Sequence, residues 1–214
     1  MINLHCHSLL SDGCFLPSEL AIRYRAVGYK VIAITDHADY SNIEKVISGI
    51  RNFTQHWPKS TGIQVLSGVE LTHLPPEQFA PLVRYCRKNK IQVVIGHGQT
   101  PVEPVIENTN RACLEAEVDI LAHPGYLSDK DAKLASKKKI FLEITSRSGH
   151  SRANSYVVKK ALIYGCRLVL SHDSHQGCDI ISWQKTVSFA QKAGLTYKHI
   201  LDILKQMQDF VKNV

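Results

Sequence analysis

Histidine and carboxylate side chains recur just past the ends of short apolar runs in this chain. The histidines at these positions are His5, His7, His37, His97, His123, His172 and His175, and the acids are Asp36, Glu70 and Asp173. If the apolar runs are parallel strands, their C-terminal ends meet at one face and bring these donors into a small volume. Imidazole nitrogens and carboxylate oxygens together suit zinc, manganese or iron, so the pattern predicts a transition-metal centre.

The elements that would position these residues alternate between strand-like and helical patterns. The strand-like runs cover residues 2–4, 30–35, 63–69, 91–96, 119–122, 140–144 and 167–171. The helical segments between them begin at Pro, Ser, Thr or Asp, and several end at Gly. Such alternation predicts an α/β protein with a parallel sheet, and right-handed crossovers let seven such units close into a barrel.

An open, doubly wound sheet is the alternative architecture. The sequence disfavours it, because no glycine-rich phosphate loop follows the first run and the candidate ligands come from nearly every strand. The last segment, residues 196–211, places its apolar side chains on one helical face. We therefore expect a terminal helix packed on the outside of the barrel.

Size and composition indicate one globular domain, residues 1–214, with 44% hydrophobic and 21% charged residues. No apolar run approaches the roughly 20 residues that a membrane span needs. The N-terminus leads directly into a strand, without the pattern of a signal peptide, so we expect a cytoplasmic protein. The six cysteines show no CxxC spacing, and we expect reduced thiols.

The formal charge of +7 favours an anionic partner such as a small phosphate ester, a nucleotide or a nucleic acid. It does not choose among them. The most concentrated basic cluster, residues 130–139, lies at the end of a predicted helix, and we interpret it as a solvated helix terminus.

Local geometry gives several of the candidate residues a first interpretation. Because alternate residues of a strand face opposite ways, His5 and His7 share one face and Cys6 points away from them. Asp36 precedes His37 and is expected to orient its ring by accepting a hydrogen bond. Asp12 lies in a turn, where it is either a ligand or a loop cap.

Taken in order, these motifs resemble those of the PHP (polymerase and histidinol phosphatase) domain family. The matching series is His5-x-His7, Ser11-Asp12-Gly13, Thr35-Asp36-His37, Gly68-x-Glu70, Gly96-His97, Ala122-His123-Pro124-Gly125, Leu142-Glu143-Ile144 and Asp173-Ser174-His175. It extends from residue 1 to about residue 180. The resemblance implies a distorted (βα)7 TIM-like barrel that holds two or three divalent metal ions and hydrolyses phosphoesters.

The resemblance also implies a division of the ligands among the ions. One ion would be held by His5, His7, Glu70 and Asp173. Glu70 would bridge to a second ion, held by His97 and His123. A third would be held by Asp12, His37 and His175.

Some residues stand outside this ligand set. His172 precedes Asp173 where the family commonly has a small residue, and alternation makes it a packing or supporting group. Glu143 lies inside a strand and is expected either to orient a ligand histidine or to remain a buried, hydrogen-bonded acid. The remaining histidines His56, His73 and His199 are interpreted as surface or packing residues.

Cations for a substrate phosphate are expected from the loop of residues 146–154, which follows the sixth strand. It carries Arg147 and Arg152, whose guanidinium groups match phosphate oxygens in pairs. The loop leads into a helix N-terminus, which also favours an anion. We therefore expect at least one of these arginines to contact the substrate.

The sequence thus predicts a metal-dependent phosphoesterase that attacks with metal-bound hydroxide and has no covalent nucleophile. Glu70, Asp173 and His175 are the predicted catalytic residues. Assistance of the leaving group is expected from a protonated water, His175 or Asp173, and the sequence does not choose among them. The substrate would be a phosphomonoester, as for histidinol phosphatase, or a nucleotide or oligonucleotide.

Two alternatives from other classes remain. One is a non-catalytic, metal-binding regulatory domain, which would not require a full ligand set. The other is a metal-dependent amidohydrolase, which commonly uses a carbamylated lysine at a strand end, where this sequence has none.

Overall fold

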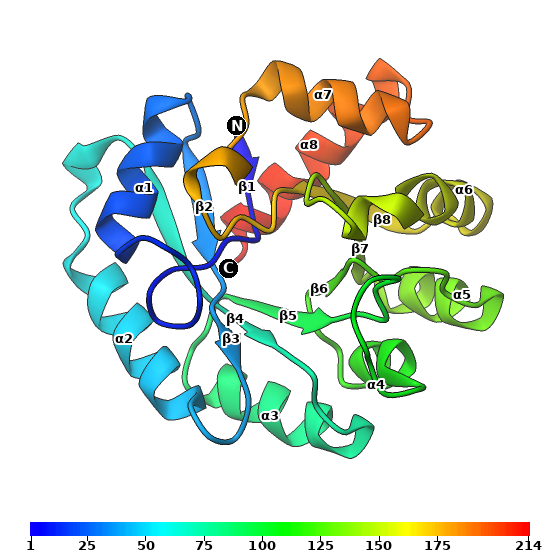
Figure 1. Ribbon diagram of the computed structural model, residues 1–214, viewed down its shortest axis with the longest axis horizontal. Coiled ribbons are helices and arrows are strands. Elements are labelled where there is room, and N and C mark those ends of the chain that lie inside the picture. The colour runs from blue at the N-terminus through cyan, green and yellow to red at the C-terminus, as the bar shows by residue number, and fades with distance from the viewer.

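The computed structural model describes residues 1–214 and shows parallel strands in the centre, surrounded by helices (Figure 1). The strands are β1 (Ile2–Asn3), β2 (Val31–Ile34), β3 (His37–Ala38), β4 (Gln64–Leu71), β5 (Val93–His97), β6 (Ile120–Ala122), β7 (Phe141–Thr145) and β8 (Arg167–Ser171). Seven of them pair in the order β1-β2-β4-β5-β6-β7-β8, each neighbour parallel to the next. This order confirms the predicted α/β barrel of seven strands.

Closure of the barrel occurs just beyond the ends of β1 and β8. There a parallel bridge joins Cys6 to Ser174. The His7 N–H donates to the Ser174 carbonyl at 2.9 Å, and the Asp173 N–H donates to the His5 carbonyl at 3.0 Å. The first and last strands therefore meet at the C-terminal end, where the candidate ligands lie, and the barrel is nearly closed.

The helices form the outer layer. They are α1 (Pro17–Ala26), α2 (Ile43–His56), α3 (Pro76–Lys88), α4 (Thr109–Glu115), α5 (Asp129–Lys138), α6 (Asn154–Tyr164), α7 (Trp183–Lys192) and α8 (Tyr197–Lys212). Short 3₁₀ turns cover Lys59–Thr61, His150–Ala153 and Gly177–Asp179. None of the helices is both long enough and apolar enough to cross a membrane.

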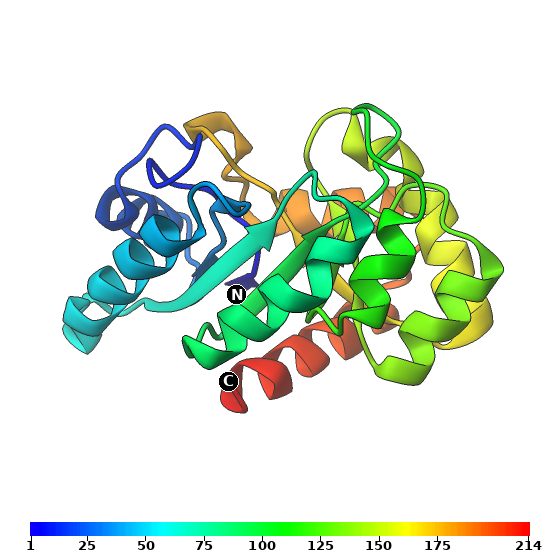
Figure 2. The same ribbon diagram turned by 90° about the horizontal axis from the view of Figure 1, so that it is seen from below.

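The terminal helix takes the position that its apolar stripe predicts. The Thr196 side chain caps α8 by accepting a hydrogen bond from the His199 N–H. The helix buries Ile200, Ile203 and Met207 and contacts β8 and β1 from outside the barrel (Figure 2). The expectation of an outer terminal helix is therefore confirmed.

Burial of both strand faces explains why polar groups at the strand ends are dehydrated. All five residues of β5 and all five of β7 are buried, as expected for parallel strands covered by helices. Polar side chains at the ends of such strands need hydrogen bonds or a bound ion, since burial without a partner is costly.

One strand differs from the prediction. The sequence pattern ends the third apolar run at Val69, but β4 continues through Glu70 to Leu71. The extension is paired on both sides, because Glu70 and Leu71 pair with His37 and Ala38 of β3 and with Ile95 and Gly96 of β5, all in parallel register. Two of the candidate ligands, His37 and Glu70, are thereby held side by side on neighbouring strands.

Candidate metal centre

The structure brings all nine predicted ligands together at the C-terminal end of the barrel. They fall into groups in which one donor atom from each residue lies within 4.8 Å of the others. These groups include His5, His7 and Glu70; His5, His123 and Asp173; Glu70, His97 and His123; and His7, Asp12, His37 and His175. Beside them opens a cavity of about 450 Å³ with no hydrophobic residue in its lining.

The first group, which consists of His5, His7, Glu70 and Asp173, surrounds a point between the first and last strands. The Nε2 atoms of His5 and His7 lie 3.1 Å apart. Glu70 Oε2 lies 3.2 Å from the first nitrogen and 3.5 Å from the second. Asp173 Oδ1 lies 3.6 Å and 3.2 Å from the same two nitrogens. Four donors therefore face one another with almost no access to solvent.

The second group, which consists of Glu70, His97 and His123, uses the other oxygen of the Glu70 carboxylate. Glu70 Oε1 lies 3.5 Å from His123 Nε2, and the rings of His97 and His123 meet edge to face with centroids 4.4 Å apart. Because Oε2 faces the first group and Oε1 faces the second, the carboxylate of Glu70 lies between them. This is the position that a bridging ligand would occupy.

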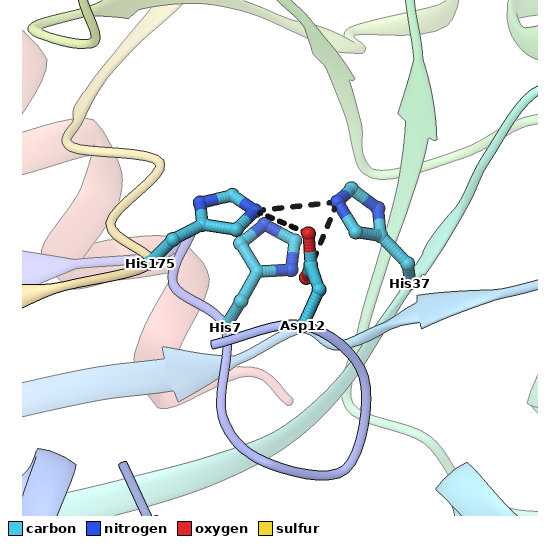
Figure 3. A group of neighbouring side chains, drawn as sticks. All are labelled: His7, Asp12, His37 and His175. Atoms are coloured by element: carbon cyan, nitrogen blue, oxygen red, sulfur yellow. Dashed lines mark hydrogen bonds and ion pairs between the residues drawn. The ribbon is translucent and has the colours of Figure 1, made fainter. Parts of the chain in front are cut away.

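The third group consists of Asp12, His37 and His175, and His7 lies beside them (Figure 3). It is the most accessible of the three groups, because the side chain of Asp12 is 55% exposed and that of His37 is 25% exposed. The Nε2 atoms of His37 and His175 lie 3.4 Å apart, and the carboxylate of Asp12 lies 3.7 Å from the first and 3.2 Å from the second. The His7 ring stacks on both of these imidazoles, with centroids 4.1 Å apart in each case. His7 thus lies between the first group and the third.

Two buried oxygen atoms without hydrogen bonds, both of Glu70, indicate that this arrangement suits bound cations. Neither oxygen of Glu70 accepts a hydrogen bond of good geometry, although the residue is fully buried and His37 Nδ1 lies 2.9 Å from Oε2. A buried carboxylate without donors is strongly destabilising. Divalent cations would satisfy both oxygens, and the surrounding nitrogen and oxygen atoms suit zinc, manganese or iron.

The electrostatics favour the protonation state of a metal ligand at His7 and Glu70, whereas nearby carboxylates outweigh burial and raise the pKa of His5 and of His37. Burial, together with the nearby His37 and His5, places the pKa of His7 well below its usual value. Burial alone would raise the pKa of Glu70, but His5 and His37 hold it well below its usual range. A neutral imidazole and an ionised carboxylate are the ligand forms of these side chains.

Glu143 contacts two of the predicted ligands, His5 and His123. Its Oε1 lies 2.7 Å from His5 Nδ1, and its Oε2 accepts a hydrogen bond of 2.8 Å from the His123 N–H. The Ser171 hydroxyl also donates to Oε1. Burial opposes ionisation, but the nearby His5 holds the pKa of Glu143 at about 2. Of the two roles expected for Glu143, the structure therefore supports orientation of a ligand histidine.

The interpretation of Asp36 as the partner of His37 is wrong. Asp36 accepts hydrogen bonds from the N–H and hydroxyl groups of Ser8 and Ser11, and it thereby anchors the loop that carries Asp12. His37 Nδ1 instead lies 2.6 Å from the Thr72 hydroxyl. Adjacent residues project in opposite directions in extended backbone, so Asp36 and His37 cannot face the same point.

Two other local predictions agree with the structure. Cys6 points away from the ligand groups and donates from Sγ to the Ala33 carbonyl at 3.1 Å. His172 is buried as a packing residue, with its ring nitrogens 3.2 Å from the Tyr24 hydroxyl and 2.9 Å from the Tyr29 hydroxyl. Burial lowers the pKa of His172 to about 4.

The two arginines expected to bind phosphate have different environments. Arg147 lines the cavity, where its Nη1 donates to the Asp173 carbonyl at 3.1 Å and lies 2.8 Å from His175 Nδ1. Arg152 is exposed in the 3₁₀ turn that precedes α6 and is not part of the cavity lining. The structure therefore favours Arg147 as the substrate contact.

Sequence reasoning missed three titratable residues of the cavity wall. His73, interpreted as an ordinary surface or packing residue, lines the cavity with Glu103 and His150. The Glu103 carboxylate lies 2.9 Å from His97 Nε2, 3.4 Å from His150 Nε2 and 3.6 Å from His73 Nε2. All three follow the C-terminal end of a barrel strand within a few residues, and this position was the available signal.

Left-handed backbone marks several residues of the centre. His73, His123 and Asp173 have φ angles of 52°, 27° and 50°. Non-glycine residues adopt such angles at a cost, and they cluster at functional sites. Gly13 has a different role, since a Cβ at this position would lie 2.2 Å from the His7 carbonyl oxygen and displace the loop.

Comparison with known proteins gives similarities along nearly the whole chain. A family model described as PHP domain matches residues 3–208. An uncharacterized protein of Methanocaldococcus jannaschii is 38% identical over 207 residues, which cover 94% of each chain. Ribonuclease P protein component 3 of Methanosarcina mazei is 30% identical over 93% of this chain and 83% of its own length. The DNA polymerase/3'-5' exonuclease PolX of Bacillus subtilis is 27% identical over 98% of this chain and 40% of its own length.

Proposed function

Because this chain belongs to the PHP domain family, we propose that it hydrolyses a phosphoester with the help of two or three divalent metal ions. The observation that carries the proposal is the position of Glu70 between two donor groups, with both of its buried oxygens lacking hydrogen bonds. Bound divalent ions would supply an activated water and neutralise charge on the phosphoryl oxygens.

The protein's own residues would prepare the site for this reaction. His5, His7, Glu70 and Asp173 would hold one ion, and Glu70 would share a second with His97 and His123. The third group, Asp12, His37 and His175, would hold a third ion near the open side of the cavity.

Substrate binding and proton transfer would involve the cavity wall. Arg147 would donate hydrogen bonds to phosphoryl oxygens, since its guanidinium already lies in the cavity. We assign assistance of the leaving group to Asp173 or His175, which contact this arginine.

The substrate class that we favour is a nucleotide or an oligonucleotide end, with a small phosphomonoester as the other candidate. Two relatives bear names that refer to RNA processing and to exonuclease activity. The net charge of +7 would attract a polyanion. A cavity of about 450 Å³ is in the size range of small-molecule sites and would admit a single phosphoester.

The competing classes have less support. A non-catalytic role fits the name of the ribonuclease P relative, but it would not require the full set of donors. An amidohydrolase with a carbamylated lysine is disfavoured because no lysine lines the cavity. We also propose a cytoplasmic location, which suits six cysteines without a disulfide.

The test is a panel of phosphate esters, including nucleotides and short oligonucleotides, assayed with Mn²⁺, Zn²⁺, Mg²⁺ or Fe²⁺. Activity should depend on added metal and be lost in Glu70→Gln, because one bridging carboxylate organises two ions. Glu44→Gln, which changes an exposed carboxylate on α2, is the matched control. Metal-independent hydrolysis, or full activity in Glu70→Gln, would contradict the proposal.

A further inference from the structure

A second cluster of donors lies on the rim of the cavity, beside the groups already described. It consists of His73, which follows β4, and Glu103, in the loop after β5, both close to His97 at the end of β5. One donor atom from each residue lies within 4.8 Å of the other two. Neither His73 nor Glu103 matches a motif position of the nine predicted ligands.

The distances in this cluster suit a single small cation. Ligand atoms about 2.0–2.2 Å from a tetrahedral ion lie roughly 3.3–3.6 Å from one another. Glu103 Oε2 lies 3.6 Å from His73 Nε2, which falls within that range, and 2.9 Å from His97 Nε2, which is shorter than the range. A small adjustment of the Glu103 side chain would equalise the two distances.

The carboxylate of Glu103 is held in place from its other side. Its Oε1 lies 3.4 Å from His150 Nε2, and the Nδ1 atom of that ring lies 2.6 Å from the Thr100 hydroxyl. His150 is buried, so this support is fixed by packing. A ligating carboxylate commonly has such a supporting partner.

Accessibility separates the rim cluster from the buried groups. The side chain of His73 is 46% exposed and that of Glu103 is 37% exposed, whereas those of Glu70 and His123 are 0% and 1% exposed. His97 belongs to both clusters, since its Nε2 faces Glu103 and the residue also groups with Glu70 and His123. His97 Nδ1 lies 3.1 Å from the Gly98 carbonyl oxygen, which leaves Nε2 as the nitrogen available to either position. One imidazole nitrogen binds one ion at a time, so the two positions cannot be filled together through His97.

We propose that His73, His97 and Glu103 form a rim position for a divalent transition-metal ion, which passes between this position and the buried one through the shared ligand His97. The rim position takes the ion from solvent, and the buried position retains it. This inference rests on metal binding at His97, as the proposed function does, but it does not depend on any hydrolytic activity.

The kinetic test uses metal-stripped protein and measures uptake of Zn²⁺ from a chromophoric chelator by stopped flow, without substrate. Glu103→Gln and His73→Ala should each slow uptake severalfold, because each removes one of the three donors of the position that takes the ion from solvent. The equilibrium affinity of the buried positions should change less than twofold. Glu107→Gln, an exposed carboxylate in the same loop, is the matched control. Unchanged rates in both variants would overturn the proposal.

The equilibrium test removes the buried position that His97 shares with Glu70 and His123. In His123→Ala the rim donors and the other two donor groups remain, so calorimetry should detect one weak Zn²⁺ ion in addition to the ions of those two groups, and Glu103→Gln should remove this weak ion alone. Equal Zn²⁺ binding in the single and double variants would overturn the proposal. Failure of the parent protein to bind any metal would instead contradict the proposed function, so the two failures are distinguishable.

Discussion

Replacement of Glu143 by Gln tests whether this buried acid organises the metal centre. The Glu143 carboxylate faces three donors, namely His5 Nδ1–H, the His123 N–H and the Ser171 hydroxyl. The amide of Gln has only one oxygen, so its NH₂ group must face at least one of these donors. The substitution also removes a negative charge, because the pKa of Glu143 is about 2 and the group is ionised at neutral pH.

The expected effect on metal affinity follows from this geometry. Partners that orient a ligating imidazole typically account for about 10–100-fold in affinity. This range corresponds to roughly 1.4–2.8 kcal/mol of binding free energy. The unsatisfied buried donor should also lower the free energy of unfolding of the metal-free protein by about 1–3 kcal/mol.

The assay is competition for Zn²⁺ between metal-stripped protein and a chromophoric chelator, together with chemical denaturation of the metal-free protein. Ser171→Ala removes only one of the three hydrogen bonds and should weaken binding less than Glu143→Gln does. Glu143→Asp keeps the charge but shortens the side chain, so it distinguishes loss of charge from loss of contact. Parental Zn²⁺ affinity in Glu143→Gln would refute the argument that Glu143 orients His5.

Two further predictions concern the substrate and pH. Arg147→Ala should lower kcat/KM for the best phosphate ester roughly 10–150-fold, which corresponds to about 1.5–3 kcal/mol of lost transition-state stabilisation, with metal content unchanged. Arg152→Ala should have little effect, because Arg152 is not part of the cavity lining. Equal effects of the two variants in steady-state kinetics would show that the phosphate contact lies elsewhere. Because burial lowers the pKa of His172 from 6.5 to about 4, His172 stabilises the fold above pH 6.5 and loses this contribution, worth about 3 kcal/mol, as the pH falls toward 4. Denaturation of the metal-free protein between these pH values should therefore show a smaller loss of stability in His172→Asn than in the parent, and identical pH profiles would contradict this account.

Much of the barrel, and the gathering of the nine candidate ligands at one end of it, could be predicted because the signals are local. A strand alternates with a period of two residues, so His5 and His7 were assigned to one face and Cys6 to the other. Parallel strands align their C-terminal ends, so donors from distant segments were expected to converge. The apolar stripe of α8 likewise predicted its position outside the barrel.

The partners of individual side chains required the tertiary structure. Asp36 was interpreted from its neighbour His37, yet its hydrogen bonds go to Ser8 and Ser11, which lie about 25 residues earlier in the chain. Similarly, the cluster of His73 and Glu103 depends on the path of two loops. Loop conformation has no short sequence period, so nothing in the local pattern indicates which side chains meet.

The sequence by itself thus determined nine candidate ligands and the end of the barrel at which they lie, but it did not indicate His73 or Glu103. Only the tertiary structure decided how they are grouped, because β3 aligns His37 with Glu70 and barrel closure places His5 next to Asp173. It also decided which arginine lines the cavity. Arg147 and Arg152 carry the same charge and lie in one loop, so the sequence alone does not distinguish them. The physical reason is that periodic backbone structure is set by neighbouring residues, whereas contacts between strand ends and loops are set by long-range packing.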